Sequence, residues 1–156
     1  MFYLRKRGKS VIRQIGGLFW FCSVFLIGFA TIIFVFPIEF NPAKGGLNLI
    51  PLDWLNAHTS THMLITETIP NVLMFIPFGI FTPIVFQKMR KFYRVALLTL
   101  LVTVSIETFQ YFIGRSADID DVLANLLGGI IGYGIFRAAS LFLEDRIWWN
   151  KLLGKQ

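Results

Sequence analysis

Polar side chains that could do chemistry recur at helical spacing in two stretches of the chain. The first set is spaced 4, 4, 3 and 4 residues apart: Thr99, Thr103, Glu107, Gln110 and Gly114. The second set is spaced 3, 4, 3 and 4 apart: Asp118, Asp121, Asn125, Gly128 and Gly132. Residues three or four apart share one face of a helix, so each set predicts one stripe. Asn71 and Arg115 are the further polar residues that we expect beside these stripes.

These residue types could support acid–base chemistry on a phosphorylated or carboxylated substrate. Glu107 could act as a general base, and Arg115 could hold a phosphate or a carboxylate. Asp118 and Asp121 could hold a divalent cation, which prefers oxygen ligands. We expect no other cofactor. The chain has no Ser, Cys or His in a nucleophile–base motif, so a reaction would depend on carboxylates alone.

The same residues also have structural interpretations. Gly128 and Gly132 form a G-x-x-x-G face, which lets helix backbones approach closely. Asp118 could cap the start of a helix, and Asp121 could complement the positive end of its dipole. Glu107 could pair with Arg115 in a buried ion pair that fixes the helix register. The sequence leaves the structural and the functional interpretation open.

Histidine and cysteine residues add little chemistry. His58 and His62 are four apart and would share one face of a helix, but the Thr-Ser-Thr run between them is weakly helical. We therefore expect no metal site there. The single cysteine, Cys22, lies in an apolar run and can form no intrachain disulfide.

Four apolar stretches must position these residues: about 15–36, 69–86, 95–113 and 122–142. Each is close to the roughly 20 residues with which a helix crosses a hydrocarbon core. The chain is 55% hydrophobic and only 15% charged, whereas soluble domains are about a quarter charged. We predict an all-α membrane protein with four transmembrane helices in a single domain, residues 1–156. The lipid bilayer is then its first partner.

Basic residues predict the orientation in the membrane. All Lys and Arg residues except Lys44 and Arg115 lie in the N-terminal tail, between the second and third stretches, or in the C-terminal part. The positive-inside rule therefore places both termini in the cytoplasm. The outer surface receives the loop 37–68, between the first two helices, and the short loop 114–121. Topology explains the net charge of +6, so we expect no nucleic-acid partner.

The short outer loop makes the third and fourth helices antiparallel neighbours, so we expect their polar stripes to face each other. Glu107 would lie about 9 Å inside the membrane, at 1.5 Å per helical residue, and an ionisable group at that depth suggests function. We expect Arg115 as its partner. After Phe142, the fourth helix could continue to the membrane surface, with Trp148 and Trp149 as interfacial anchors. In the long loop, residues 51–55 suggest a short amphipathic turn or helix.

Four motifs within residues 48–133 resemble, in combination and order, those of the VanZ-like family of small bacterial membrane proteins. They are Asn48-Leu49-Ile50-Pro51; Asn71 to Gly79; Glu107-Thr108-Phe109-Gln110; and Arg115-Ser116-Ala117-Asp118-Ile119-Asp120-Asp121 followed by Asn125, Gly128 and Gly132. The resemblance implies a multi-pass protein of the bacterial plasma membrane. Founding members of the family lower susceptibility to teicoplanin-type glycopeptides, whereas other members occur without a resistance cluster. No reaction transfers with the family.

Three functions remain as hypotheses. The first is a cell-envelope protein without catalysis, which acts on lipoglycopeptides or lipid-linked wall precursors at the outer leaflet; its small size suits a homo-oligomer. The second is a membrane-embedded hydrolase or transferase that acts on a lipid-linked envelope substrate through Glu107 with Asp118 and Asp121. The third, a transporter, is least favoured, because the polar residues lie near one surface and four spans are few.

Overall fold

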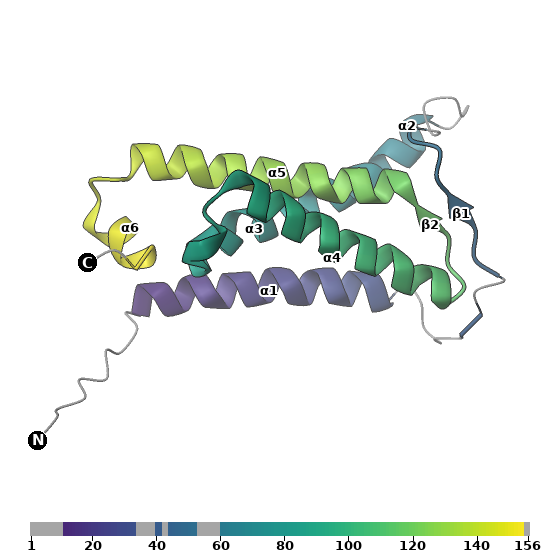
Figure 1. The fold of residues 1–156 in the computed structure, drawn as a ribbon, viewed down its shortest axis with the longest axis horizontal. Coiled ribbons are helices and arrows are strands. Elements are labelled where there is room, and N and C mark those ends of the chain that lie inside the picture. The colour runs from purple at the N-terminus through teal and green to yellow at the C-terminus, as the bar shows by residue number, and fades with distance from the viewer. Residues whose placement is uncertain (1–10, 34–39, 42–43, 53–59, 155–156) are drawn as a thin grey trace, which may run out of the picture.

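Four long helices make up most of the structure, a computed structural model that describes residues 11–33, 40–41, 44–52 and 60–154 (Figure 1). They are α1 (Val11–Ile33), α3 (Ile69–Val85), α4 (Phe92–Phe112) and α5 (Ile119–Phe142). Each coincides largely with a segment that is long and apolar enough to cross a membrane. The predicted all-α fold with four transmembrane helices is confirmed.

The second span begins earlier than the sequence predicted. A short helix, α2 (Ser60–Met63), and a π-helical turn, η2 (Leu64–Thr68), run directly into α3, so the apolar span covers Leu64–Val85. Pro70 lies in the first turn of α3, a position that suits proline. Because proline has no backbone N–H, Pro70 cannot donate a hydrogen bond to the carbonyl oxygen four residues back. The π-helical turn lies at the position of this missing hydrogen bond. A single 3₁₀ turn, η3 (Gln87–Met89), then joins α3 to α4.

Helix α3 is the centre of the bundle, and it packs most extensively against α5. A Cβ atom on Gly128 would overlap the carbonyl oxygen of Val72, and one on Gly132 would overlap that of Ile76. The prediction that the whole α5 stripe faces α4 was therefore wrong, because its glycines face α3. Helix α4 meets the adjacent face of α5 at Gly129, where a Cβ would lie 2.6 Å from the hydroxyl oxygen of Thr99.

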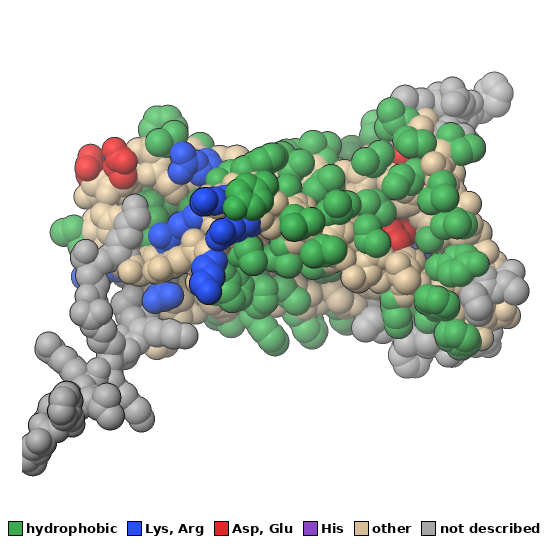
Figure 2. Space-filling model, in the orientation of Figure 1, with side chains coloured by type: hydrophobic (Ala, Val, Ile, Leu, Met, Phe, Trp, Pro, Cys, Tyr) green, Lys and Arg blue, Asp and Glu red, His purple; other side chains and the backbone are tan. Residues whose placement is uncertain are grey.

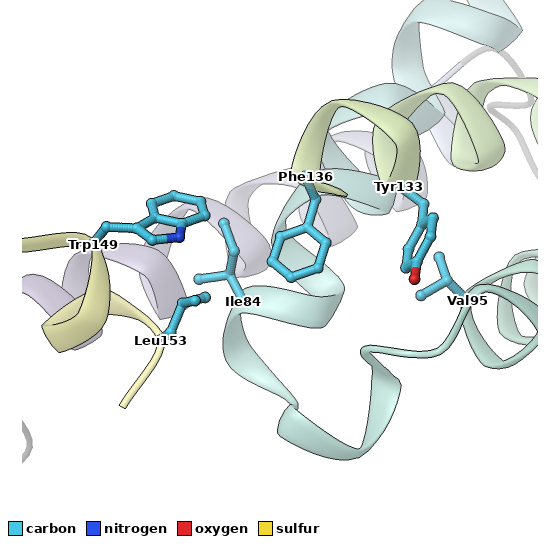
Figure 3. Close-up of a cluster of buried hydrophobic side chains, with 6 residues drawn as sticks. All are labelled: Ile84, Val95, Tyr133, Phe136, Trp149 and Leu153. Atoms are coloured by element: carbon cyan, nitrogen blue, oxygen red, sulfur yellow. The ribbon is translucent and has the colours of Figure 1, made fainter. Parts of the chain in front are cut away.

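Apolar side chains close the bundle at the end where α3 and α4 are joined (Figure 3). The buried cluster consists of Ile84, Val95, Tyr133, Phe136, Trp149 and Leu153. The last two come from a short helix, α6 (Ile147–Leu152), and from the residue after it. Tyr133 also donates its hydroxyl to the carbonyl oxygen of Arg90 at 2.8 Å.

The prediction that the fourth helix continues through both tryptophans was wrong. Helix α5 ends at Phe142, and α6 folds back onto α1, while Trp149 and Leu153 pack with Ile84 of α3. Trp149 is 5% exposed, whereas Trp148 is 48% exposed. The amide of Asn150 donates to the carbonyl oxygen of Glu144 at 2.7 Å, which fixes the reversal. Burial of the Trp149 side chain in the cluster outweighs its use as an interfacial anchor.

The start of α1 and the helix α6 lie at the same end of the bundle (Figure 1). Figure 2 shows Lys and Arg side chains gathered at this end, while apolar side chains cover the middle of the bundle. The other end carries the two loops that the sequence predicted to lie outside the cell. The side of the membrane on which each end lies stays a prediction from the positive-inside rule.

Candidate functional site

The two predicted outer loops are joined to each other by backbone pairing. The strands β1 (Leu47–Asn48) and β2 (Ala117–Asp118) run parallel, and the N–H of Ala117 donates to the carbonyl oxygen of Gly46 at 2.9 Å. Between α4 and β2 the chain turns at Gly114, which has a φ of +78°, a value that favours glycine. The long loop is therefore fixed to the short one directly above the polar stripes.

Asp118 lies in this loop junction, where its carboxylate has two structural partners. It caps α5 by accepting from the backbone N–H of Asp120 at 2.8 Å. It also accepts from the side-chain amide of Asn48 at 3.0 Å. Asp120 in turn accepts from the backbone N–H of Leu52 at 2.6 Å. Both aspartates thus hold the long loop on the start of α5.

Glu107 lies beneath the junction and is only 7% exposed. One carboxylate oxygen accepts from the backbone N–H of Asp118 at 3.1 Å. With the Gln110 amide oriented as a donor, its nitrogen lies 3.2 Å from both carboxylate oxygens. Among the described residues, the hydrogen-bond donors to Glu107 are these two groups and not the guanidinium of Arg115. The expected ion pair between Glu107 and Arg115 was therefore wrong. The turn at Gly114 brings the backbone of β2 over Glu107 and leaves Arg115 exposed.

A polar cavity of about 460 Å³ opens beside Glu107, between residues of all four spans. Six of the seven residues that the sequence predicted for a polar cluster line it: Asn71, Glu107, Gln110, Arg115, Asp121 and Asn125. The seventh, Asp118, is in the loop junction. The remaining lining residues are Ala30, Thr31, Thr66, Glu67, Pro70, Met74 and Ile106. This cavity is the candidate functional site.

Two hydrogen bonds tie the helices together around the cavity. The amide of Asn71 in α3 donates to the carboxylate of Asp121 in α5 at 2.7 Å. The amide of Asn125 in α5 donates to the hydroxyl of Thr103 in α4 at 2.9 Å. These bonds fix the polar groups on three helices relative to one another, which is the preorganisation that a binding site needs.

Asn125 is the residue that a packing role explains least. It is 3% exposed, and its side-chain oxygen has no hydrogen-bond partner. A buried acceptor without a donor costs about 1–3 kcal/mol. Since Asn125 lines the cavity, a bound molecule with an N–H or O–H group could supply the missing donor.

The sequence prediction missed three polar residues of the cavity. Glu67 lies four residues before Asn71, and this helical spacing is a signal that could have identified it. Thr66 comes from the π-helical turn, which a pattern of apolar residues does not reveal. Thr31 comes from α1, and its hydroxyl donates to the carbonyl oxygen of Ile27 at 2.8 Å. Nothing in the hydrophobic first span distinguishes it.

Asp118 and Asp121, the predicted cation ligands, engage different partners, Asn48 and Asn71 respectively. In the described part of the chain, no three His, Cys, Asp or Glu side chains are grouped to hold a metal ion. His58 and residues 53–55 of the predicted amphipathic segment lie outside the described residues. The structure places Pro51 and Leu52 in a turn, and Leu52 has a positive φ of 60°.

Comparison with known proteins supports a shared architecture. The family model described as VanZ/LLP1 matches residues 19–143. Protein VanZ of Enterococcus faecium is 31% identical over 140 residues, which cover 89% of this chain and 81% of that protein. No solved structure matches the chain. The family match includes every residue that lines the polar cavity.

Proposed function

The chain belongs to the VanZ/LLP1 family of membrane proteins, and we propose that it is a non-catalytic protein of the bacterial cell envelope. In this proposal it acts at the outer leaflet of the plasma membrane and lowers the binding of teicoplanin-type glycopeptides to the cell. The observation that carries the proposal is the polar cavity that lies between the four apolar helices. Polar groups at membrane depth are costly, so their grouping around an open space favours a binding role.

Charge supports the placement at the outer leaflet. The residues between α3 and α4 include Lys88, Arg90 and Lys91, and α6 carries Lys151. The positive-inside rule assigns this end to the cytoplasm. The cavity lies at the opposite ends of α4 and α5 and therefore faces the outer leaflet, where lipoglycopeptides and lipid-linked wall precursors meet the membrane.

The second candidate is a hydrolase or transferase that acts on a lipid-linked envelope substrate. It is favoured by one observation, the presence of Glu107 and Asp121 on the wall of the same cavity as Arg115. Glu107 would accept a proton, while Arg115 would hold a phosphate. Because Asp118 is occupied by Asn48 and the Asp120 N–H, the carboxylates of such a reaction would be Glu107 and Asp121.

The test measures teicoplanin and vancomycin susceptibility, together with binding of a labelled lipoglycopeptide to the surface of a Gram-positive host. The host expresses wild type, Glu107→Gln or Glu144→Gln at matched membrane levels. Glu144 is exposed beyond the end of α5 and serves as the control. We expect wild type and Glu144→Gln to lower teicoplanin binding and Glu107→Gln to lose the effect. No difference between wild type and an empty vector would refute the proposal.

Mass spectrometry of lipid-linked envelope molecules from the same strains tests the second candidate. A hydrolase or transferase would give a product that is present with wild type and absent with Glu107→Gln. Identical lipid profiles, combined with a change in glycopeptide binding, would support the non-catalytic function over the enzyme.

A further inference from the structure

A second, apolar groove lies next to the polar cavity, on the surface between α1 and α4. It has a volume of about 450 Å³, and its walls include Gly28 of α1 and Leu101, Val102 and Phe109 of α4. Helix α1 packs on α3, whereas α4 packs mainly on α5. The groove is the space that this arrangement leaves between the two outer helices.

The groove and the cavity share part of their walls. Thr31 of α1 and Ile106 of α4 line both of them. Along α4, the groove begins at Leu101 and the cavity reaches Gln110, so the apolar part lies deeper along the helix than the polar part. A molecule with a chain at one end and a polar group at the other would match this order.

We propose that the groove binds the hydrocarbon chain of a membrane lipid whose headgroup, rich in hydrogen-bond donors, occupies the polar cavity. The nine residues from Leu101 to Phe109 span eight helical steps, which extend about 12 Å along the helix. This is close to the roughly 15 Å depth of one leaflet of a 30 Å hydrocarbon core. The groove therefore fits the chain of a lipid that remains in its own leaflet.

The hydroxyl groups in the groove do not make its surface polar. Ser105 donates to the carbonyl oxygen of Leu101 at 2.7 Å, and Thr31 donates to that of Ile27 at 2.8 Å. Both donors are satisfied within their own helices. Gly28 adds free volume, because a Cβ atom there would have no protein atom within 4 Å. Since α1 and α4 are membrane spans, their outward surface faces the hydrocarbon, from which a chain can occupy the groove laterally.

The headgroup chemistry follows from an excess of acceptors in the cavity. In the described part of the chain, three carboxyl groups line it, on Glu67, Glu107 and Asp121, and the oxygen of Asn125 lacks a donor. Among the described residues of the wall, Arg115 carries the one guanidinium group. Ammonium or hydroxyl hydrogens would satisfy the acceptors, while a phosphate would pair with Arg115. A phospholipid whose headgroup carries an amine or hydroxyl groups meets both conditions.

The inference uses the same cavity as the proposed function and deepens it by naming the ligand class. It requires neither an antibiotic nor a reaction. Lipid retention by the purified protein and glycopeptide binding to cells are separate measurements. Specific lipid retention without any effect on glycopeptide binding would refute the proposed function and support this inference. An effect on glycopeptide binding without specific lipid retention would support the proposed function and refute this inference.

The experiment is native mass spectrometry of the full chain after exchange into lipids with identical acyl chains. Phosphatidylethanolamine and phosphatidylglycerol carry ammonium and hydroxyl donors, whereas phosphatidylcholine carries no N–H or O–H in its headgroup. We expect at least one donor lipid to be retained about tenfold over phosphatidylcholine, the effect of one or two hydrogen bonds. The preferred donor lipid identifies whether amine or hydroxyl hydrogens occupy the cavity. Equal retention of all three would overturn the proposal.

Two variants distinguish binding of the hydrocarbon chain in the groove from binding of the headgroup in the cavity. Gly28→Phe should fill the groove and reduce retention of every lipid about tenfold, while Gly17→Phe, in the same helix and also without neighbours within 4 Å, should leave it unchanged. Asn125→Leu should abolish the preference among headgroups. Equal effects of Gly28→Phe and Gly17→Phe would overturn the proposal. The proposal would also be overturned if the wild-type protein formed a dimer that Gly28→Phe disrupts and Gly17→Phe does not, because a second copy of the protein would then occupy the groove.

Discussion

The close approach of α3 and α5 gives a stability prediction in which two glycines of one helix behave oppositely. Gly132 faces the backbone of α3, where an added Cβ would overlap the carbonyl oxygen of Ile76 and lie 2.9 Å from the Cα of Gly79. Gly134 lies two residues further along α5 and has no atom within 4 Å of an added Cβ. Gly132→Ala and Gly134→Ala therefore introduce the same methyl group into different surroundings.

The expected magnitudes combine two effects. Alanine is better than glycine in a helix by about 1 kcal/mol, which stabilises both variants. Overpacking costs about 1–3 kcal/mol. The upper value applies at Gly132, because the obstacle there is backbone rather than a flexible side chain. Gly132→Ala should therefore lose about 2 kcal/mol, or about thirtyfold in the folding equilibrium constant. Gly134→Ala should gain up to about 1 kcal/mol.

The assay is equilibrium unfolding in mixed micelles, with a denaturing detergent as the variable and circular dichroism as the signal. Tryptophan fluorescence gives a second signal, because the side chain of Trp149 is buried in the folded protein. The variants should shift the midpoint in opposite directions relative to wild type. Equal midpoints, or a more stable Gly132→Ala variant, would refute the assignment of this glycine face to α3.

Three further predictions use the same unfolding assay. Glu107→Ala should cost about 2 kcal/mol because it leaves the partly buried N–H of Asp118 without its acceptor. Glu107→Gln keeps an acceptor oxygen, so a loss as large as that of the alanine variant would contradict this role. Asn125→Leu removes a hydrogen bond but also an unpaired buried acceptor. These two effects oppose each other, so the free energy of unfolding should change by less than about 1 kcal/mol. A larger loss would show that the Asn125 oxygen is already satisfied in the free protein. Trp149→Ala should cost about 3–5 kcal/mol and Trp148→Ala less than about 0.5 kcal/mol, whereas similar losses would contradict the burial of α6.

The sequence by itself determined the number of spans and the identity of most polar residues near the cavity. Apolar length is a direct measure of the ability of a helix to cross a membrane, and the four stretches needed no tertiary information. Polar residues are rare in such stretches because lipid cannot satisfy them. The regular spacing of Glu107, Gln110, Asp121 and Asn125 was therefore visible at once, and all four line the cavity.

The tertiary structure decided which groups meet. Helical spacing shows which residues share a face, but not which neighbour that face meets, so only the structure placed Gly128 and Gly132 against α3. A loop sequence does not fix the direction of its backbone groups, so the Asp118 N–H above Glu107 could not be predicted. Hydrophobicity alone does not distinguish contact with lipid from contact with protein. For this reason the burial of Trp149, and the groove between α1 and α4, depend on how the helices pack.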